Sequence, residues 1–370
     1  MKTDISVTEP DLRPARHPAL AALLALLLGT FAHAQDSGAF HDQGVARCGA
    51  CHVTHEGSND RIVMQGADPL LLAATPTDVC LSCHGGGDGV FGLNPGLPPP
   101  ERGAGNFVFL FEDNLNDGVG GTQNPIHGEA AGHSIVSMDY GVVAESRWAF
   151  APGGTFPSNQ LGCTSCHDPH GNTGFRMLNG VGPVQDGFFQ FVSPAPLAVG
   201  LDSSDPLATE TRDRHTAYRQ GMSDWCANCH GLYHRDQPGS AGFEHDVNEP
   251  LRGVELNRYN AYDGAANPAG GSAATAYLPE VPFEDPTMTT GTTSGPGPAS
   301  RVMCLSCHRA HASSGPASGR WDFNLEALDQ DGIVSGSWPL PNPYGDVGQP
   351  GLCVKCHRQE GPHDILPDRR

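Results

Sequence analysis

The chain has 370 residues with 41 acidic and 21 basic side chains, and its formal net charge of −20 argues against nucleic acid and for a cationic partner or a mineral surface. Lysine occurs only at Lys2 and Lys355, which excludes a docking surface built on lysines. Only 38% of the residues are hydrophobic, with 48 glycines and 32 prolines, so the peptide alone would form a poor core.

The N-terminal segment has the features of an export signal. Basic residues at Lys2, Arg13 and Arg16 precede a mostly apolar run over residues 19–31, and the cleavage site Ala32-His33-Ala34 follows. The run is too short to cross a bilayer and no other long apolar stretch follows, so we expect no transmembrane segment. We predict that residues 1–34 are a cleaved signal peptide, in preference to an uncleaved anchor, and that the protein is secreted through the periplasm to the outer cell surface or the medium.

All twelve cysteines lie in Cys-x-x-Cys-His pentapeptides. In this motif two thiols form thioethers with the vinyl groups of one haem, and the histidine becomes the proximal ligand of the iron. A disulfide framework would not place a histidine after every pair, a zinc ribbon needs a second close pair, and a thioredoxin-like motif would occur once. The sequence therefore predicts six covalently bound haem c groups per chain. The six copies are Cys48-Gly-Ala-Cys51-His52, Cys80-Leu-Ser-Cys83-His84, Cys163-Thr-Ser-Cys166-His167, Cys226-Ala-Asn-Cys229-His230, Cys304-Leu-Ser-Cys307-His308 and Cys353-Val-Lys-Cys356-His357.

The spacing of the motifs and the composition between them predict an irregular fold. The motifs begin at 48, 80, 163, 226, 304 and 353, with no fixed period, so the chain is not a solenoid repeat. Segments 85–105 and 265–299 are rich in glycine and proline and are expected to form surface loops or covering coil. We predict a multihaem cytochrome c fold that is mostly coil, with short helices at the haem motifs, few strands and a haem stack as the core. Residues 35–370 are expected to form a single elongated haem-bearing domain.

The sixth ligand of each iron must come from outside its pentapeptide. Ten further histidines follow residue 34, and their surplus favours bis-histidine ligation over methionine, for which Met64, Met138, Met177, Met222, Met288 and Met303 are available. Three motifs extend to a second histidine three residues on: His52-Val-Thr-His55, His167-Asp-Pro-His170 and His308-Arg-Ala-His311. Residues three apart on a helical turn share a side, whereas the two ligands of one iron lie on opposite faces of the haem. The second histidine of each extension must therefore serve a different, neighbouring haem.

The remaining histidines divide into expected ligands and others. We expect His41, His133 and His245 to be ligands, because the first lies near the start of the mature chain and the other two lie far from any motif. His234 competes with His245 for one position. His127, His215 and His363 are interpreted as solvated or structural.

Longer sequence strings around the motifs identify a protein family much more specifically than the pentapeptide does. They include Gly132-His133-Ser134-Ile135-Val136, Ala151-Pro152-Gly153-Gly154-Thr155, Cys166-His167-Asp168-Pro169-His170-Gly171 and Gln220-Gly221-Met222-Ser223-Asp224-Trp225-Cys226. These strings resemble the outer-membrane cytochrome S-like family of extracellular hexahaem cytochromes, which form filaments. The resemblance implies bis-histidine haems stacked in a continuous chain and little regular secondary structure. It further implies that His55 crosses a subunit boundary to ligate the haem held by His308 of the next protomer. His41, His133, His170, His234, His245 and His311 have counterparts in the family, whereas His127 and His215 have none.

Three classes of function fit a multihaem cytochrome. The favoured one is a head-to-tail homopolymer that carries electrons from other cytochromes to extracellular acceptors such as metal oxides. The alternative is a monomeric periplasmic or surface electron shuttle. A multihaem reductase would need an iron with an open position, and the Cys-x-x-Cys-Lys site that marks it in pentahaem nitrite reductases is missing. We therefore expect no enzymatic activity.

Overall fold

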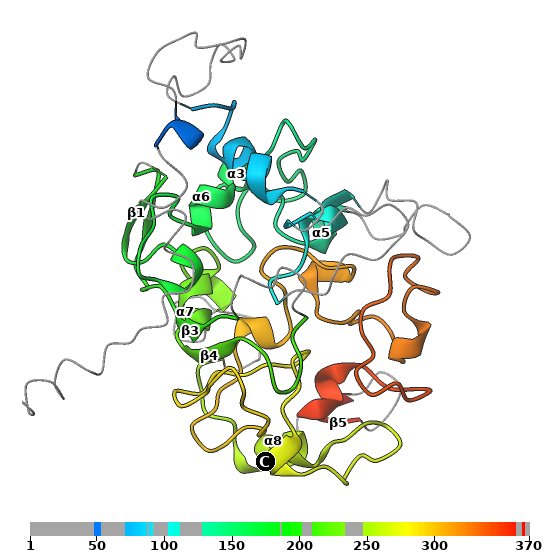
Figure 1. Cartoon of the computed structure of the whole chain (residues 1–370). Helices are drawn as coiled ribbons and strands as arrows, with labels where there is room; N and C mark the ends of the chain where they lie inside the picture. The colour runs from blue at the N-terminus through cyan, green and yellow to red at the C-terminus, as the bar shows by residue number, and fades with distance from the viewer. Residues whose placement is uncertain are drawn as a thin grey trace, which may run out of the picture. The chain divides into compact units, whose positions relative to one another are not determined.

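Short helices separated by long loops dominate the computed structural model (Figure 1). It describes residues 48–52, 71–86, 89–91, 103–111, 128–185, 187–201, 209–233, 247–359 and 365–366, all within one compact unit, Asp36–Arg370. The predicted signal peptide lies outside the described residues. The division of the chain into a signal peptide and one mature domain stays a prediction.

The described helices are a few turns long at most. The α-helices are α3 (Pro76–His84), α5 (Gly128–Ala131), α6 (Cys163–Cys166), α7 (Met222–Cys226) and α8 (Gly253–Ala261). The 3-10 turns are η1 (Cys48–Ala50), η2 (Phe107–Phe111), η3 (Ser158–Gln160), η4 (Phe175–Met177), η5 (Gly231–Tyr233), η6 (Ala273–Thr275), η7 (Cys304–Ser306), η8 (Pro316–Ser318), η9 (Leu328–Gln330) and η10 (Leu352–Lys355). Among the described helices, none is long and apolar enough to cross a membrane.

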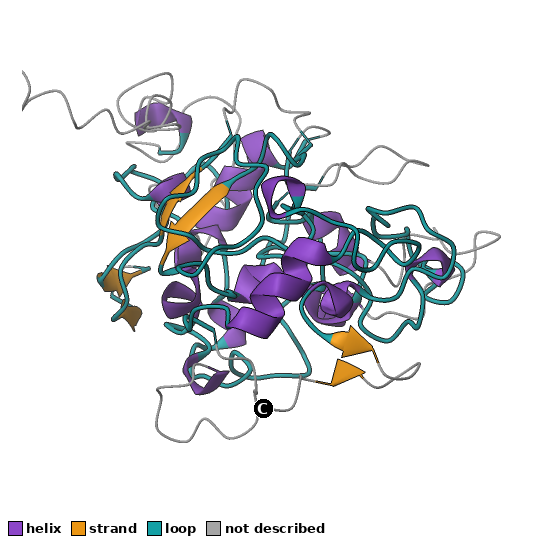
Figure 2. Ribbon diagram, turned by 90° about the horizontal axis from the view of Figure 1, so that it is seen from below, coloured by secondary structure: helices purple, strands orange, loops and turns teal. Residues whose placement is uncertain are grey.

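The strands form small isolated ribbons, which stand out as orange pairs among the loops in Figure 2. Within the described residues, all three sheets are two-stranded and antiparallel. They pair β1 (Gly182–Val184) with β2 (Phe189–Phe191), β3 (Leu197–Val199) with β4 (Ala217–Gln220), and β5 (Arg358–Gln359) with β6 (Ile365–Leu366). The prediction of a mostly coiled fold with few strands is confirmed.

A short helix occurs at every haem motif, as the sequence predicts. The motifs begin in η1, α3, α6, the end of α7, η7 and η10, respectively. The longest of these, α3, starts with a side-chain cap, because Thr75 Oγ1 accepts a hydrogen bond from the Asp78 backbone N–H at 3.1 Å, and Pro76 occupies its first turn.

Within the described part of the chain, buried apolar residues gather in three separate clusters instead of one core. One is centred on Tyr259 and Trp321, a second on Phe91 and Phe107, and a third on Met222. Cysteines from four haem motifs pack against these clusters: Cys307, Cys353 and Cys356 against the first, Cys163 against the second and Cys226 against the third. The haem attachment points therefore lie at the edges of the hydrophobic clusters, as expected for a fold whose core includes the haems.

Candidate functional site

Each haem motif closes a helical turn that gathers its reactive side chains. In the third to sixth motifs the backbone N–H of the histidine donates to the carbonyl oxygen of the first cysteine. Because residues three apart on such a turn share a side, the two thiols point the same way, and the imidazole belongs to the residue directly after the second thiol. The N–O distances are 2.9 Å for His167, 3.0 Å for His230, 3.1 Å for His308 and 2.9 Å for His357. In the second motif His84 ends α3.

Backbone carbonyls fix the orientation of three motif histidines. Their Nδ1–H groups donate to Arg176 O at 2.9 Å from His167, to Pro152 O at 2.8 Å from His230, and to Ala317 O at 2.8 Å from His308. A carbonyl oxygen can only accept, so the proton lies on Nδ1 and Nε2 keeps its lone pair for a metal. Metal-binding histidines in proteins are commonly oriented in this way.

The third and fifth motifs share one supersecondary unit. In both, the accepting carbonyl lies nine residues after the histidine, on a residue with left-handed backbone: φ is 52° at Arg176 and 56° at Ala317. In both motifs an antiparallel bridge joins the histidine to the residue eleven positions further on. The histidine of the first motif also forms an antiparallel bridge, but to a residue nineteen positions further on. The bridges are His167–Leu178, His308–Gly319 and His52–Leu71. The three odd-numbered motifs, which are those with an extra histidine three residues on, therefore all have a bridge at the motif histidine.

Two pairs of imidazole rings are spaced to hold one metal ion between them. The ring centroids of His52 and His170 are 6.2 Å apart with planes at 8°, and those of His133 and His230 are 5.9 Å apart with planes at 43°. A metal lies about 2 Å from a ligating imidazole nitrogen, and the ring centroid lies about 1 Å behind it, so two opposite ligands have centroids about 6 Å apart. Both pairs fit an intervening haem iron.

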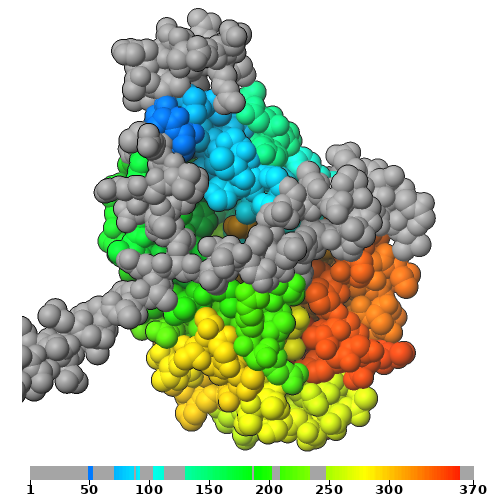
Figure 3. Space-filling model, in the orientation of Figure 1, coloured from blue at the N-terminus to red at the C-terminus, as the bar shows by residue number. Residues whose placement is uncertain are grey.

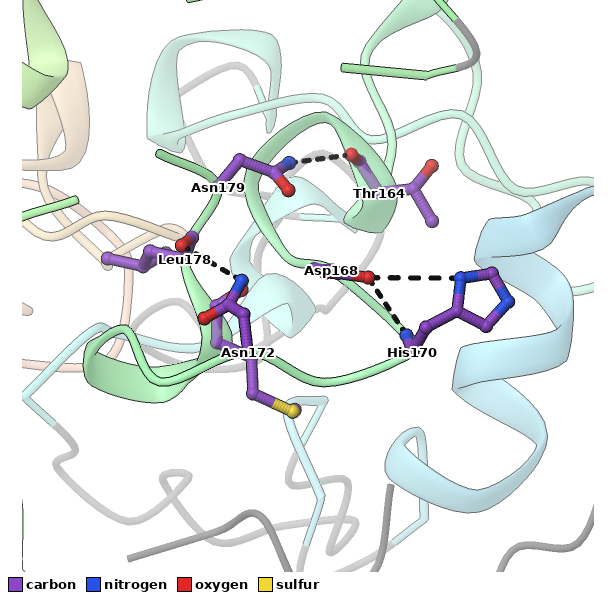
Figure 4. Close-up of polar contacts among 7 residues, drawn as sticks. Thr164, Asp168, His170, Asn172, Leu178 and Asn179 are labelled. Atoms are coloured by element: carbon purple, nitrogen blue, oxygen red, sulfur yellow. Dashed lines mark hydrogen bonds and ion pairs between the residues drawn. The ribbon is translucent and has the colours of Figure 1, made fainter. Parts of the chain in front are cut away.

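Asp168 holds His170 in place in the His52–His170 pair (Figure 4). Its Oδ1 accepts a hydrogen bond from the His170 backbone N–H at 2.9 Å and lies 3.9 Å from His170 Nδ1. The side-chain amide of Asn179 donates to the Thr164 carbonyl at 3.1 Å and ties the following loop back to the third motif. A carboxylate beside the outer nitrogen of an imidazole orients the ring and raises its basicity as a ligand.

The segments that carry His133 and His311 lie side by side. The His133 backbone N–H donates to the His311 carbonyl at 2.8 Å, and His133 Nδ1–H donates to the Ala310 carbonyl at 2.6 Å. Gly132 permits this approach, because a Cβ atom there would overlap with the His311 carbonyl. His133 thus faces the fourth motif through His230, while His311 lies close enough to the third motif that the charge of His167 acts on it.

The protein around these histidines keeps them neutral at neutral pH. Burial, followed by the charge of His167, lowers the pKa of His311 to about 3. Burial, followed by the charge of His133, lowers the pKa of His230 to about 4. Burial also lowers the pKa of His133. Neutral imidazole is the form that binds metals.

Cysteines of successive motifs are neighbours in space, and the motifs meet in two alternating ways. In the first kind of junction the first cysteines of both motifs meet. Between the second and third motifs, the neighbouring Cys80 thiol, followed by burial, raises the pKa of Cys163. Between the fourth and fifth motifs, Cys304 acts in the same way on Cys226.

In the second kind of junction, the second cysteine of an odd-numbered motif faces both cysteines of the next motif. Electrostatic interaction between these thiols adds to burial in raising pKa values at each junction. The neighbours are Cys51 with Cys80 and Cys83, Cys166 with Cys226 and Cys229, and Cys307 with Cys353 and Cys356. The described cysteines form no disulfides with one another. The six motifs thus follow one another in space in the order of the sequence.

His215 is held by carbonyl groups on both sides of its ring. Its Nδ1 and Nε2 lie 2.9 Å and 2.8 Å from the carbonyl oxygens of Thr216 and Thr292, and its ring stacks on Tyr277 with centroids 3.6 Å apart. Both ring nitrogens therefore face backbone carbonyls, and neither is directed at an open position where a metal could bind. Three methionines considered as alternative ligands, Met222, Met288 and Met303, are buried in the hydrophobic clusters.

Some predicted ligands lie outside the described residues. These are His41, His55, His245 and its competitor His234. His127 and His363, which are interpreted as solvated or structural, also lie outside the described residues. The side chain of Cys48 is also outside the described part of the chain, although its backbone begins η1. The roles of these residues stay predictions.

Comparison with known proteins points to one group of cytochromes. Residues 41–89 match the family model of the doubled CXXCH motif. The chain is 31% identical to the C-type cytochrome OmcS of Geobacter sulfurreducens, over 87% of this chain and 94% of that protein. It is similar to the solved outer membrane cytochrome S filament of the same organism, with a TM-score of 0.63, 27% identity, and 77% and 86% of the two chains covered. It is also similar to the OmcS nanowires, with a TM-score of 0.69, 26% identity, and 84% and 98% covered.

Proposed function

We propose, from the premise that this chain belongs to the family of the C-type cytochrome OmcS, that it carries electrons over long distances outside the cell through six haem c groups per subunit. Haem iron supplies reversible one-electron chemistry when bound. One observation carries the proposal: the attachment cysteines of each motif neighbour those of the next, so six haems would form an unbroken series. Such a series is what stepwise electron transfer along the chain requires.

Each iron is assigned two histidines. The motif histidines are the proximal ligands, and the second ligands are His41, His55, His133, His170, His245 and His311. The spacing of the His52–His170 and His133–His230 rings supports two of these assignments. Ligation by two imidazoles leaves no open position for a substrate, so the protein is an electron carrier rather than a reductase.

The repeated unit of the odd-numbered motifs supports the assignment of His55. In the third motif the extra histidine, His170, faces the histidine of the first motif, which is two motifs earlier. In the fifth motif the extra histidine, His311, lies toward His167 of the third motif, again two motifs earlier. By the same rule the extra histidine of the first motif, His55, serves a motif two places before it. With six motifs per subunit, that position is the fifth motif of a neighbouring subunit, the one with His308.

A subunit contact closed by this bond would be heterologous, because donor and acceptor surfaces differ. Such contacts extend into open filaments when the rotation between subunits does not close. The solved relatives are a filament and nanowires by their own descriptions. The proposed assembly is a head-to-tail homopolymer that receives electrons from other cytochromes and passes them to extracellular acceptors such as metal oxides.

The test compares His55→Ala with the control His127→Ala, since His127 is a non-motif histidine without a predicted role. The wild type should contain six haems by pyridine haemochrome assay and mass, with a chain that begins near Gln35, and should form fibres in electron micrographs. His55→Ala should give soluble monomers with five low-spin haems and one that binds CO, while the control should behave as the wild type. Fibres with six low-spin haems in His55→Ala would refute the assignment. If the wild type were monomeric, the result would favour the alternative function of a monomeric electron shuttle.

A further inference from the structure

Lys355 is an unusual residue in this chain, because it is the only lysine after Lys2 and it is buried. It lies inside the sixth haem motif, directly before Cys356 and two residues before His357. Its exposed fraction is 2%, although lysine is among the residues least often buried. It ends η10 and reaches the residue that follows α8, and in Figure 3 the red C-terminal part of the chain borders the yellow-green region.

Among the residues that the structure describes, none forms an ion pair with the Lys355 ammonium. Its Nζ donates to the Tyr262 carbonyl at 2.7 Å and lies 4.6 Å from the ring centroid of Tyr259 and 5.7 Å from that of Tyr344. These groups stabilise a cation by a hydrogen bond and by their ring faces, without neutralising its charge.

An ammonium in this setting acts on its surroundings more strongly than a surface charge does. The carbonyl oxygen of Tyr262 and the ring faces of Tyr259 and Tyr344 stabilise the protonated form of this amine. Because little water surrounds it, its charge is weakly screened. The nearest redox group would be the haem attached through the adjacent Cys356. A positive charge favours the reduced state of that haem, since reduction adds a negative charge.

We propose that Lys355 is a fixed internal cation that raises the reduction potential of the haem bound by the sixth motif. The residue determines the energy of one step in the electron path without touching the electron acceptor. The aromatic cage of Tyr259 and Tyr344 has the complementary role of holding the charge in the interior. This inference rests on the proposed haem at the sixth motif.

The test is a potentiometric titration of the haem-loaded protein, followed by absorbance, for wild type and Lys355→Met. Methionine keeps much of the length and the contact with the tyrosine rings but has no charge. We expect one of the haem components to titrate at lower potential, with a change on the order of tenfold in its oxidised-to-reduced ratio, which is about 59 mV for one electron. Lys355→Arg should keep the wild-type curve. The matched control is Arg212→Met, which removes an exposed cation that also acts on Lys355 and should shift the curve much less.

Haem counts of the same samples separate the two proposals. Fewer than six haems in the wild type would count against the proposed function, whatever the titrations show. With six haems present, superimposable curves for wild type and Lys355→Met, a shift to higher potential, or an equal shift of all components would overturn the role of Lys355. If both Lys355→Met and Lys355→Gln lose a haem while Lys355→Arg keeps it, the charge serves folding, and the proposal is also wrong.

Discussion

Replacing His170 by alanine should convert one haem of the six to a high-spin state. The imidazole of His170 lies opposite that of His52 with a centroid spacing of 6.2 Å, and removing it leaves one side of that site without a ligand. Its side chain is 80% exposed, so the substitution opens little buried space and the fold should persist. We expect about one sixth of the low-spin signal to disappear from the electron paramagnetic resonance spectrum. The reduced protein should then bind about one CO per subunit, measured by absorbance titration.

His215→Phe is the matched control for this experiment, because it also removes a histidine but one held between two carbonyls. Phenylalanine keeps the stacking on Tyr277 but removes the ring N–H that a neighbouring carbonyl accepts, which should cost about 1–3 kcal/mol of unfolding free energy. The low-spin signal of this variant should equal that of the wild type. If His170→Ala keeps all its low-spin haems, or if His215→Phe gains a high-spin one, the reasoning from ring spacing is wrong.

Three further predictions follow from the same contacts. Asp168→Asn removes the carboxylate beside His170 Nδ1 and should raise the reduction potential of one haem, seen as a shift of one component in a potentiometric titration; an unchanged curve would contradict this. Gly132→Val should push apart the segments of His133 and His311 and give two high-spin haems, measured by CO stoichiometry; wild-type stoichiometry would show that the approach is not needed. The folded-state pKa values of His230 and His311 lie below the usual 6.5, so the unfolded chain binds protons before the folded chain does as the pH falls. The urea concentration at the midpoint of unfolding should therefore decrease as the pH is lowered from about 6.5 to about 3. A midpoint that stays constant over this range would refute the last prediction.

The sequence was sufficient to predict what depends on local spacing. The Cys-x-x-Cys-His pattern requires a helical turn that brings two thiols to one side, and a short helix occurs at each motif. The high glycine and proline content predicts loops, and loops join these helices. The geometry of one turn also predicts that His170 must serve a haem other than its own.

The partner of each second ligand could not be predicted from spacing alone, because it depends on the path of the chain in three dimensions. That His170 faces the first motif emerges only when the third motif packs beside the first. One sequence signal could have indicated the offset of two: the extra histidine occurs in the odd-numbered motifs alone. Likewise, the burial of Lys355 contradicts what its residue type suggests, and the packing of α8 against η10 is its cause.

The alternation of two kinds of junction between motifs makes the parity of the haem number matter. The first and second motifs meet in one way, the second and third in the other, and so on to the sixth. In the proposed filament, the sixth motif of one subunit precedes the first of the next, and an even number keeps the alternation in phase across that boundary. The junction between subunits would then be of the same kind as a junction inside the subunit, so the electron path would be uniform across the boundary. A chain of this design could gain or lose motifs in evolution only two at a time, since a subunit with five or seven would place two junctions of the same kind in succession.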